Sequence, residues 1–225
     1  MSISHLPAPV RDFFHAMKSN DVDGAMSTFH PSANLMDADY CFEAEGIAEH
    51  LVFLLRQLGN NLRAMHTAKR SDEHILTVIA GPGAGTAYNW YFGVKDASIT
   101  HLRVASIDWS MLPPPVKAYI DAANNGDLAG LMESLAEDAL VNDQLFDYWG
   151  KEQILPWAAS EIIGEQFRLQ VLGILKHYDQ VIVTASVDGT FDKKGLPDPL
   201  ILAFYFCALD DKIVQLIILR NHTWI

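Results

Sequence analysis

Apolar residues recur at helical spacing near the start of each half of the chain. Side chains three and four positions apart lie on one face of an α-helix, so each stripe predicts a helix with one buried side. The two stripes are Val10, Phe13, Phe14 and Met17, and Val116, Tyr119, Ile120 and Ala123. A shorter stripe follows Asp21 and Asp127, and aspartate is a frequent N-cap residue. A third helix is expected after Gly46 and Gly150.

Strand-forming residues follow in both halves. A short strand and a loop are expected before the third helix, ending near Asp37 and Asp143. Four further segments per half are rich in Val, Ile, Thr and aromatic residues, which is typical of strands. These segments are residues 62–69, 74–80, 84–95 and 98–109, and residues 167–176, 180–189, 199–209 and 212–224. Helices first and strands last predict an α+β fold with three helices packed on a curved antiparallel sheet.

The order of elements occurs twice because the sequence itself repeats. Leu6-Pro7-Ala8-Pro9-Val10 recurs as Leu112-Pro113-Pro114-Pro115-Val116, and Trp90-Tyr91-Phe92 corresponds to Phe204-Tyr205-Phe206. The segment 191–199 has no counterpart in the first half, and we interpret it as a surface insertion. The sequence therefore predicts a tandem duplication of a cone-shaped unit, with domains at residues 1–110 and 111–225.

Composition is that of a globular protein. Hydrophobic residues make up 50% and charged residues 20% of the chain, which is enough for a core in each domain. The 16 Lys and Arg residues against 28 Asp and Glu residues give a net charge of −12. Such a surface repels phosphate backbones, so no nucleic-acid partner is expected.

The cysteines, the N-terminal residues and the length of the apolar segments indicate the cellular compartment. Cys41 and Cys207 lie at non-matching places in the two halves, so a disulfide framework is not expected. The N-terminal residues lack the charged start and apolar stretch of a signal peptide. No apolar segment reaches the roughly 20 residues that span a bilayer. We therefore expect a cytoplasmic protein with no membrane partner.

Three motifs stand out in the second half. They are Tyr119-Ile120-Asp121-Ala122-Ala123-Asn124-Asn125-Gly126-Asp127-Leu128, then Ala136-Glu137-Asp138-Ala139, then Val141-Asn142-Asp143. Together they resemble the first part of ketosteroid isomerases and SnoaL-like polyketide cyclases, which belong to the nuclear transport factor 2-like superfamily. The first half is similar at residues 19–26 and 35–37. Members of this superfamily commonly dimerise through their sheets. The resemblance therefore implies an intrachain pseudo-dimer with its two sheets face to face, and it leaves a further homo-oligomer open.

The resemblance also implies candidate catalytic residues. Proton transfer at a carbon beside a carbonyl needs a carboxylate base and hydrogen-bond donors for the enolate oxygen. In the second half the resemblance makes Asp143 the base and Tyr119 a donor, while a second donor would fall near Ala203, which has no donor group. In the first half Asp37 takes the base position and Asn89 falls near the second donor.

Structural roles for the same residues stay open. Asp37 and Asp143 end a strand before a turn, where aspartate often acts as a local cap. Tyr119 lies on an apolar helix stripe and fits a core position. Asn89 fits a hydrogen bond to a cross-strand neighbour. His66 is a candidate acid–base partner of Asp37, and a lone histidine is also common in a structural role.

Aromatic residues gather between the second and third helices of the second half. They are Phe146, Tyr148, Trp149 and Trp157. They fit an aromatic-lined pocket for a flat apolar ligand, and they equally fit ordinary packing. The nine histidines form no HxH or HExxH pattern, and no glycine-rich loop precedes a helix, so neither a metal nor a cofactor is expected.

Three functions are compatible with the sequence. The first is a cofactor-independent isomerase, cyclase or dehydratase that acts on a small apolar carbonyl compound through Asp143 and Tyr119. The second is a non-catalytic protein that binds a small apolar molecule in the same pocket. The third is a protein-interaction module, because this fold hosts all three kinds of protein.

Overall fold

The computed structural model describes residues 3–59, 61–81 and 85–220. The chain divides into two compact units, Met1–Ile107 and Asp108–Ile225, and this boundary lies close to the join expected after residue 110. The predicted face-to-face packing of the two sheets stays a prediction. None of the helices among the described residues is long and apolar enough to cross a membrane.

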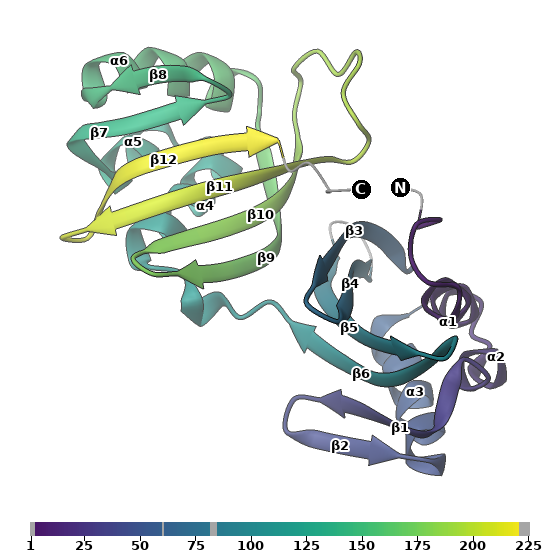
Figure 1. Cartoon of the computed structure of the whole chain (residues 1–225). Helices are drawn as coiled ribbons and strands as arrows, with labels where there is room; N and C mark the ends of the chain where they lie inside the picture. Colours follow the sequence, from purple (N-terminus) through teal and green to yellow (C-terminus); the bar gives the residue numbers. More distant parts are fainter. Residues whose placement is uncertain (1–2, 60, 82–84, 221–225) are drawn as a thin grey trace. The chain divides into compact units, whose positions relative to one another are not determined.

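Among the described residues, the first unit has three helices and one sheet (Figure 1). The helices are α1 (Ala8–Lys18), α2 (Val22–Met26) and α3 (Glu45–Leu58). The strands are β1 (Phe29–Asp37), β2 (Tyr40–Glu43), β3 (Arg63–Arg70), β4 (Glu73–Ala80), β5 (Thr86–Lys95) and β6 (Ser98–Ser106). In the described residues they form a six-stranded sheet of order β2-β1-β6-β5-β4-β3.

The second unit repeats this arrangement. After a 3₁₀ turn, η1 (Trp109–Met111), the helical segments are α4 (Pro114–Asn125), α5 (Leu128–Ser134), α6 (Gly150–Trp157) and the π-helical η2 (Ala158–Gly164). The strands are β7 (Leu135–Asp143), β8 (Phe146–Trp149), β9 (Arg168–His177), β10 (Gln180–Asp188), β11 (Leu200–Leu209) and β12 (Lys212–Arg220). Over the described part of this unit the sheet order is β8-β7-β12-β11-β10-β9.

The predicted fold class is confirmed: each unit is α+β, with helices on a curved sheet. Two details differ from the prediction. The residues after Asp37 and Asp143, for which no strand was predicted, form strands β2 and β8, which pair antiparallel with β1 and β7. In addition, β1 runs parallel to β6, and β7 runs parallel to β12, so each mostly antiparallel sheet contains one parallel pair.

Local sequence signals set the ends of the helices. Proline precedes α1 and α4 and also occupies their first turn, where its missing N–H costs nothing. The helix α4 ends at Gly126, which has the left-handed φ of 71° that glycine adopts without strain. Asp21 and Asp127 cap α2 and α5, since their side chains accept hydrogen bonds from backbone N–H groups inside the first turn.

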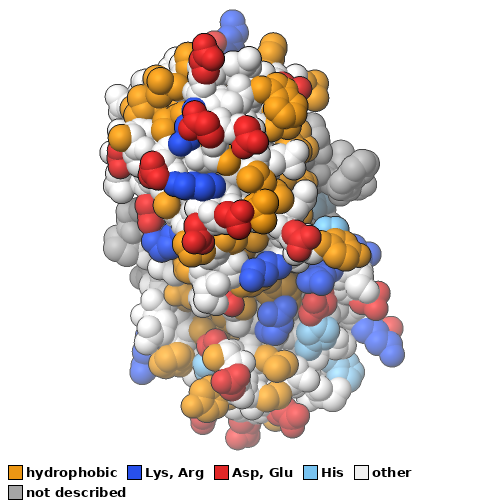
Figure 2. All heavy atoms as spheres, turned by 90° about the vertical axis from the view of Figure 1, so that its left-hand side faces the viewer, with side chains coloured by type: hydrophobic (Ala, Val, Ile, Leu, Met, Phe, Trp, Pro, Cys, Tyr) orange, Lys and Arg blue, Asp and Glu red, His pale blue; other side chains and the backbone are white. Residues whose placement is uncertain are grey.

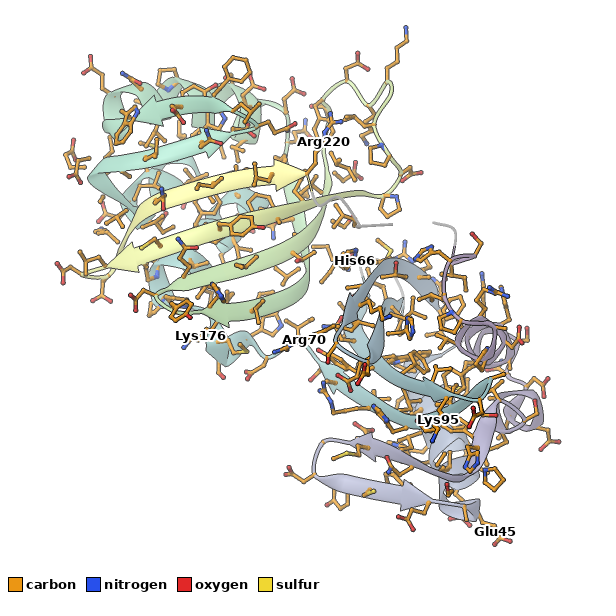
Figure 3. All side chains as sticks on the ribbon, viewed as in Figure 1. Glu45, His66, Arg70, Lys95, Lys176 and Arg220 are labelled. Carbon is orange, nitrogen blue, oxygen red and sulfur yellow. The ribbon has the colours of Figure 1, made fainter. Side chains whose placement is uncertain are left out.

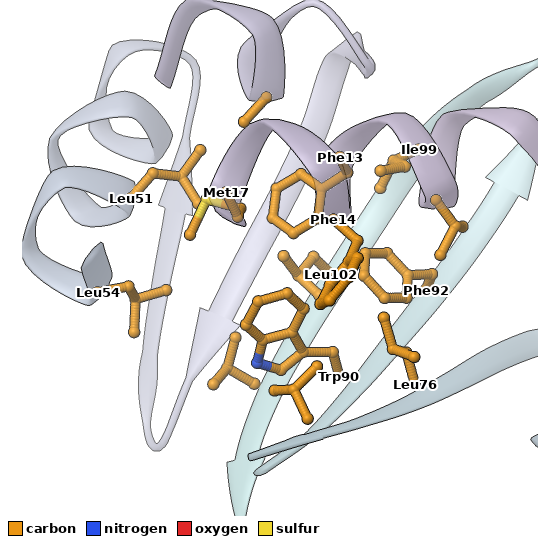
Figure 4. Close-up of a cluster of buried hydrophobic side chains, with 14 of the residues drawn as sticks. Phe13, Phe14, Met17, Leu51, Leu54, Leu76, Trp90, Phe92, Ile99 and Leu102 are labelled. Atoms are coloured by element: carbon orange, nitrogen blue, oxygen red, sulfur yellow. The ribbon is translucent and has the colours of Figure 1, made fainter. Parts of the chain in front are cut away.

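Aromatic side chains fill the interior of the first unit (Figure 4). The ring of Phe13 on α1 lies 5.6 Å from Trp90 and 5.5 Å from Phe92, both on β5, in edge-to-face geometry. Trp90 is 1% exposed. Its Nε1 is the one buried side-chain nitrogen or oxygen in the described ranges that has no hydrogen-bond partner.

On the outside of the molecule, acidic, basic and apolar side chains are interspersed over the face shown in Figure 2. Scattered apolar residues are normal on protein surfaces, and Trp149 and Phe146, at 59% and 70% exposed, are among the larger ones.

The cap of α5 gives a test of the local signals. Asp127 Oδ1 accepts from the Gly130 N–H at 2.9 Å. We expect Asp127→Ala to lower the free energy of unfolding by about 1 kcal/mol, since a backbone donor loses its partner. Asp127→Asn keeps an acceptor and should stay close to the wild type in urea denaturation. Equal stability of the alanine variant and the wild type would contradict this role.

Candidate functional site

Asp143 is the last residue of β7, which lies between β8 and β12 in the second sheet. Its Cα pairs with Ile218 of the parallel strand β12, and the next N–H, that of Gln144, donates to the Ile218 carbonyl at 3.1 Å. Two residues of positive φ, Gln144 and Leu145, then turn the chain into β8. The carboxylate Oδ2 accepts a hydrogen bond from Trp157 Nε1 at 3.1 Å. The strand pairing and this bond together fix the position of the carboxyl group.

A cavity of about 180 Å³ lies against Asp143. Its wall is mainly apolar, with four polar residues among the lining side chains. The lining residues are Asp143, Gln144, Glu161, Ile162, Phe167, Phe191, Leu196, Leu200, Leu202, Ile218 and Arg220. An apolar hollow with a few convergent polar groups is the usual form of a small-molecule site.

The cavity changes the acidity of Asp143. Burial raises the pKa of its carboxyl group, because a charged carboxylate is poorly solvated in an apolar wall. The hydrogen bond from Trp157 opposes this shift, while the negative charge of Glu161 adds to it. A carboxylate with a raised pKa is a better proton acceptor at working pH, as a general base requires.

The helical side of the cavity comes from an irregular helix. The helix α6 contains Pro156 and continues into the π-helical η2, which contributes Glu161 and Ile162 to the lining. Proline removes a backbone hydrogen bond, and π-helical turns occur frequently at functional sites. In the first unit the corresponding helix, α3, is a regular α-helix of 14 residues.

The segment without a counterpart in the first half contributes to the same cavity. Phe191 and Leu196 both line it, and the ring of Phe191 lies 6.3 Å from that of Phe167. The sequence analysis interpreted residues 191–199 as a surface insertion. That interpretation was incomplete, because two apolar residues of the segment line the cavity while most of its other residues are exposed.

Tyr119 lies in the core of the second unit. It is 1% exposed, its ring packs edge-to-face on Phe206 at 5.5 Å, and it is not among the described residues that line the cavity. Burial raises the pKa of its hydroxyl strongly, and the charge of Asp143 raises it further. The side chain therefore occupies the core position that its apolar helix stripe allows.

The aromatic residues around β8 have two different surroundings. The ring of Tyr148 lies 5.7 Å from that of Trp157, the residue that donates to Asp143. Trp157 is 3% exposed, whereas Trp149 is 59% exposed. Tyr148 and Trp157 thus support the carboxylate, and the aromatic rings that line the cavity are Phe167 and Phe191.

In the first unit the structure gives Asp37 a different partner from the expected one. Asp37 Oδ2 lies 2.9 Å from Nε2 of His50, and the imidazole ring stacks on Phe42 at 4.0 Å. His66 was the expected partner, but it lies on β3, where its Cα pairs with Thr77 of β4, and burial lowers its pKa (Figure 3). His50 lies on the third helix of the first unit, and Trp157 lies on the third helix of the second. This shared position is the signal from which the pairing of His50 with Asp37 could have been found.

Strand alternation explains where Asn89 lies. Trp90 pairs with Val104, which pairs with Asp37, so these three side chains share the concave face of the sheet. Asn89 precedes Trp90 and points to the opposite face, where its Oδ1 accepts from Thr77 Oγ1 at 2.7 Å. Its counterpart in the second unit is Ala203, which also points away from the cavity, whereas the preceding residue, Leu202, lines it.

Within the residues that the structure describes, no group of three or more His, Cys, Asp or Glu side chains is arranged to hold a metal ion. The chemistry that this site offers from its own side chains is acid–base chemistry at Asp143 and charge recognition at Glu161 and Arg220.

No family profile matches the chain, and no curated protein sequence matches it. Several solved structures are similar to about half of it. One is a candidate polyketide cyclase from Sinorhizobium meliloti, with 28% identity over 50% of this chain and 100% of that one, at a TM-score of 0.46.

Two further structures match a similar share. One is a nuclear transport factor 2-like protein of unknown function from Cytophaga hutchinsonii, with 13% identity over 48% of this chain and 87% of that one, at a TM-score of 0.40. The other is a protein with a ketosteroid isomerase-like fold from Catenulispora acidiphila. Its identity is 22% over 48% of this chain and 85% of that one, at a TM-score of 0.40. Each of these similarities covers about half of the chain, which is about the length of one of its two units.

Proposed function

We propose that the second unit binds a small, mostly apolar carbonyl compound and moves a proton at the carbon beside its carbonyl group, with Asp143 as the base. The observation that carries this proposal is a carboxylate of raised pKa in the wall of an otherwise mainly apolar cavity. Isomerisation, cyclisation and dehydration all begin with this proton transfer, so the proposal covers a reaction class.

The size of the cavity limits the ligand. A cavity of about 150 Å³ in an apolar protein core holds a benzene molecule. The cavity beside Asp143 measures about 180 Å³. Its ligand is therefore a compound of roughly one ring with a small substituent, and the rings of Phe167 and Phe191 offer apolar faces to it.

The proposed step balances without a further reactant. The carboxylate of Asp143 takes the proton from the carbon next to the carbonyl group. The electron pair of that C–H bond forms a carbon–carbon double bond, and the π pair of the carbonyl moves onto oxygen to give an enolate. Return of the proton to a different atom completes an isomerisation, and its return to the same carbon exchanges the hydrogen with solvent.

Trp157 is a positioning residue in this proposal. Its indole N–H holds Oδ2 of Asp143 at 3.1 Å, which restricts the rotation of the carboxyl group. Tyr148 packs on the indole ring and keeps it in place.

A non-catalytic ligand-binding protein is the second candidate. It is favoured by the position of Tyr119, which is buried against Phe206 and is not among the cavity residues of the described chain. It is also favoured by Leu202, which faces the cavity without a donor group. A protein that only binds needs neither donor.

Hydrogen exchange at carbon separates the two candidates. In deuterium oxide, the wild type should speed the exchange of the methyl protons of acetophenone or the α-protons of cyclohexanone, followed by proton NMR. Asp143→Asn should lower the protein-dependent rate by about 10²-fold or more, which is the usual contribution of a general base.

Asp138→Asn is the matched control, because Asp138 is an exposed carboxylate on the same strand, outside the cavity. It should exchange at the wild-type rate. Binding of either ketone without any exchange above the buffer rate would contradict proton transfer and leave the ligand-binding function.

The raised pKa of Asp143 predicts a pH-dependent stability difference. In the folded state this carboxyl group holds its proton to higher pH than in the unfolded state, so ionisation destabilises the fold as pH rises through the folded pKa. Asp143→Asn has no such group and still accepts from Trp157. Its melting temperature should exceed that of the wild type at neutral pH, and the gap should close below the unfolded pKa of aspartate, near 3.8. A gap that is independent of pH would show that another effect dominates.

A further inference from the structure

Arg220 is the one basic residue among the described residues that line the cavity. It lies at the end of β12 (Figure 3), and its Cα pairs with Leu202 of β11, another lining residue. Directly paired residues share a sheet face, so Arg220 is on the concave face with Ile218 and Asp143. One strand spacing and two residues along the strand separate Asp143 from Arg220, or roughly 8 Å between Cα atoms.

We propose that Arg220 binds an anionic group of the ligand, so that the second unit selects ring-sized apolar acids that carry a carboxylate. This inference rests on the proposed binding role of the cavity and adds the charge of its ligand. The guanidinium group offers five N–H donors in a planar fork that matches the two oxygens of a carboxylate.

The contacts already made at the cavity involve its carboxylates and leave Arg220 available to a ligand. Both carboxylates are acceptors in use: Asp143 accepts from Trp157 and Gln144, and Glu161 accepts a long 3.5 Å bond from Ser160 Oγ. Arg220 makes no ion pair within the described residues, although two carboxylates line the same cavity. The guanidinium group of Arg220 is therefore left to contact a ligand, and its complement is an acceptor with negative charge.

This charge belongs to the second unit alone. In the first unit Asp37 pairs with Val104 as Asp143 pairs with Ile218, so the residue at the place of Arg220 is Ser106. Serine offers one neutral hydroxyl group and cannot hold a carboxylate in a two-bond fork. The proposed selectivity for acids therefore depends on a position that differs between the two halves.

Three probes with the same ring test the ligand charge: benzoate, benzamide and benzylamine, titrated by calorimetry or NMR. The wild type should bind benzoate more tightly than benzamide, and benzylamine most weakly. Arg220→Gln should weaken benzoate binding about 10-fold, the usual effect of losing a hydrogen bond to a charged group, and should change benzamide binding little. Arg220→Lys should fall between the two, because it keeps the charge and loses the fork.

Two control variants sharpen the result. Lys176→Gln removes the same charge from an exposed position on β9 outside the cavity, and it should leave benzoate binding unchanged. Glu161→Gln removes a repelling carboxylate and should strengthen benzoate binding. Unchanged benzoate affinity in Arg220→Gln would overturn the inference. Preferred binding of benzylamine, lost in Glu161→Gln, would also overturn it and would identify a site for organic cations.

The outcome is separable from that of the proposed proton transfer. Asp143→Asn should abolish exchange at carbon and still bind benzoate through Arg220. If exchange on neutral ketones depends on Asp143 while benzoate binding ignores Arg220, the proposed function stands and the inference about Arg220 fails.

Discussion

A carboxylate held by a ring nitrogen from the third helix is the contact on which both candidate sites depend. In the first unit the contact joins Asp37 to His50 at 2.9 Å, and in the second it joins Asp143 to Trp157 at 3.1 Å. Each aspartate ends a strand that pairs in parallel with β6 or β12, the strand that comes last in the sequence of its unit. This pairing places the carboxyl group on the concave face of the sheet. A half-buried carboxylate without such a donor would carry an uncompensated desolvation penalty.

The two units use this contact differently because their interiors are filled differently. In the first unit Trp90 occupies the row of Asp37 across the sheet, and its buried indole packs with Phe13 in a dense core. In the second unit Phe204 takes that row beside Ile218. Its irregular third helix and the segment 191–199 then line a cavity against the carboxylate. A duplicated fold can therefore keep one carboxylate geometry and change what surrounds it.

The second site contains charges of both signs in an apolar wall. Burial raises the pKa of Asp143, whereas Glu161 and Arg220 contribute to the same wall as exposed residues. The strand register places Asp143 and Arg220 on one face of the sheet.

The sequence by itself determined the tandem α+β architecture, since helical stripes, strand composition and caps such as Asp127 depend on local chemistry and repeat with the chain. It also singled out Asp37 and Asp143, the aspartates that end strands β1 and β7. Only the tertiary structure decided which side chains meet them. Asn89 fell on the other face because adjacent residues of a strand point to opposite sides, and His50 reached Asp37 because helix packing joins residues that no local pattern connects.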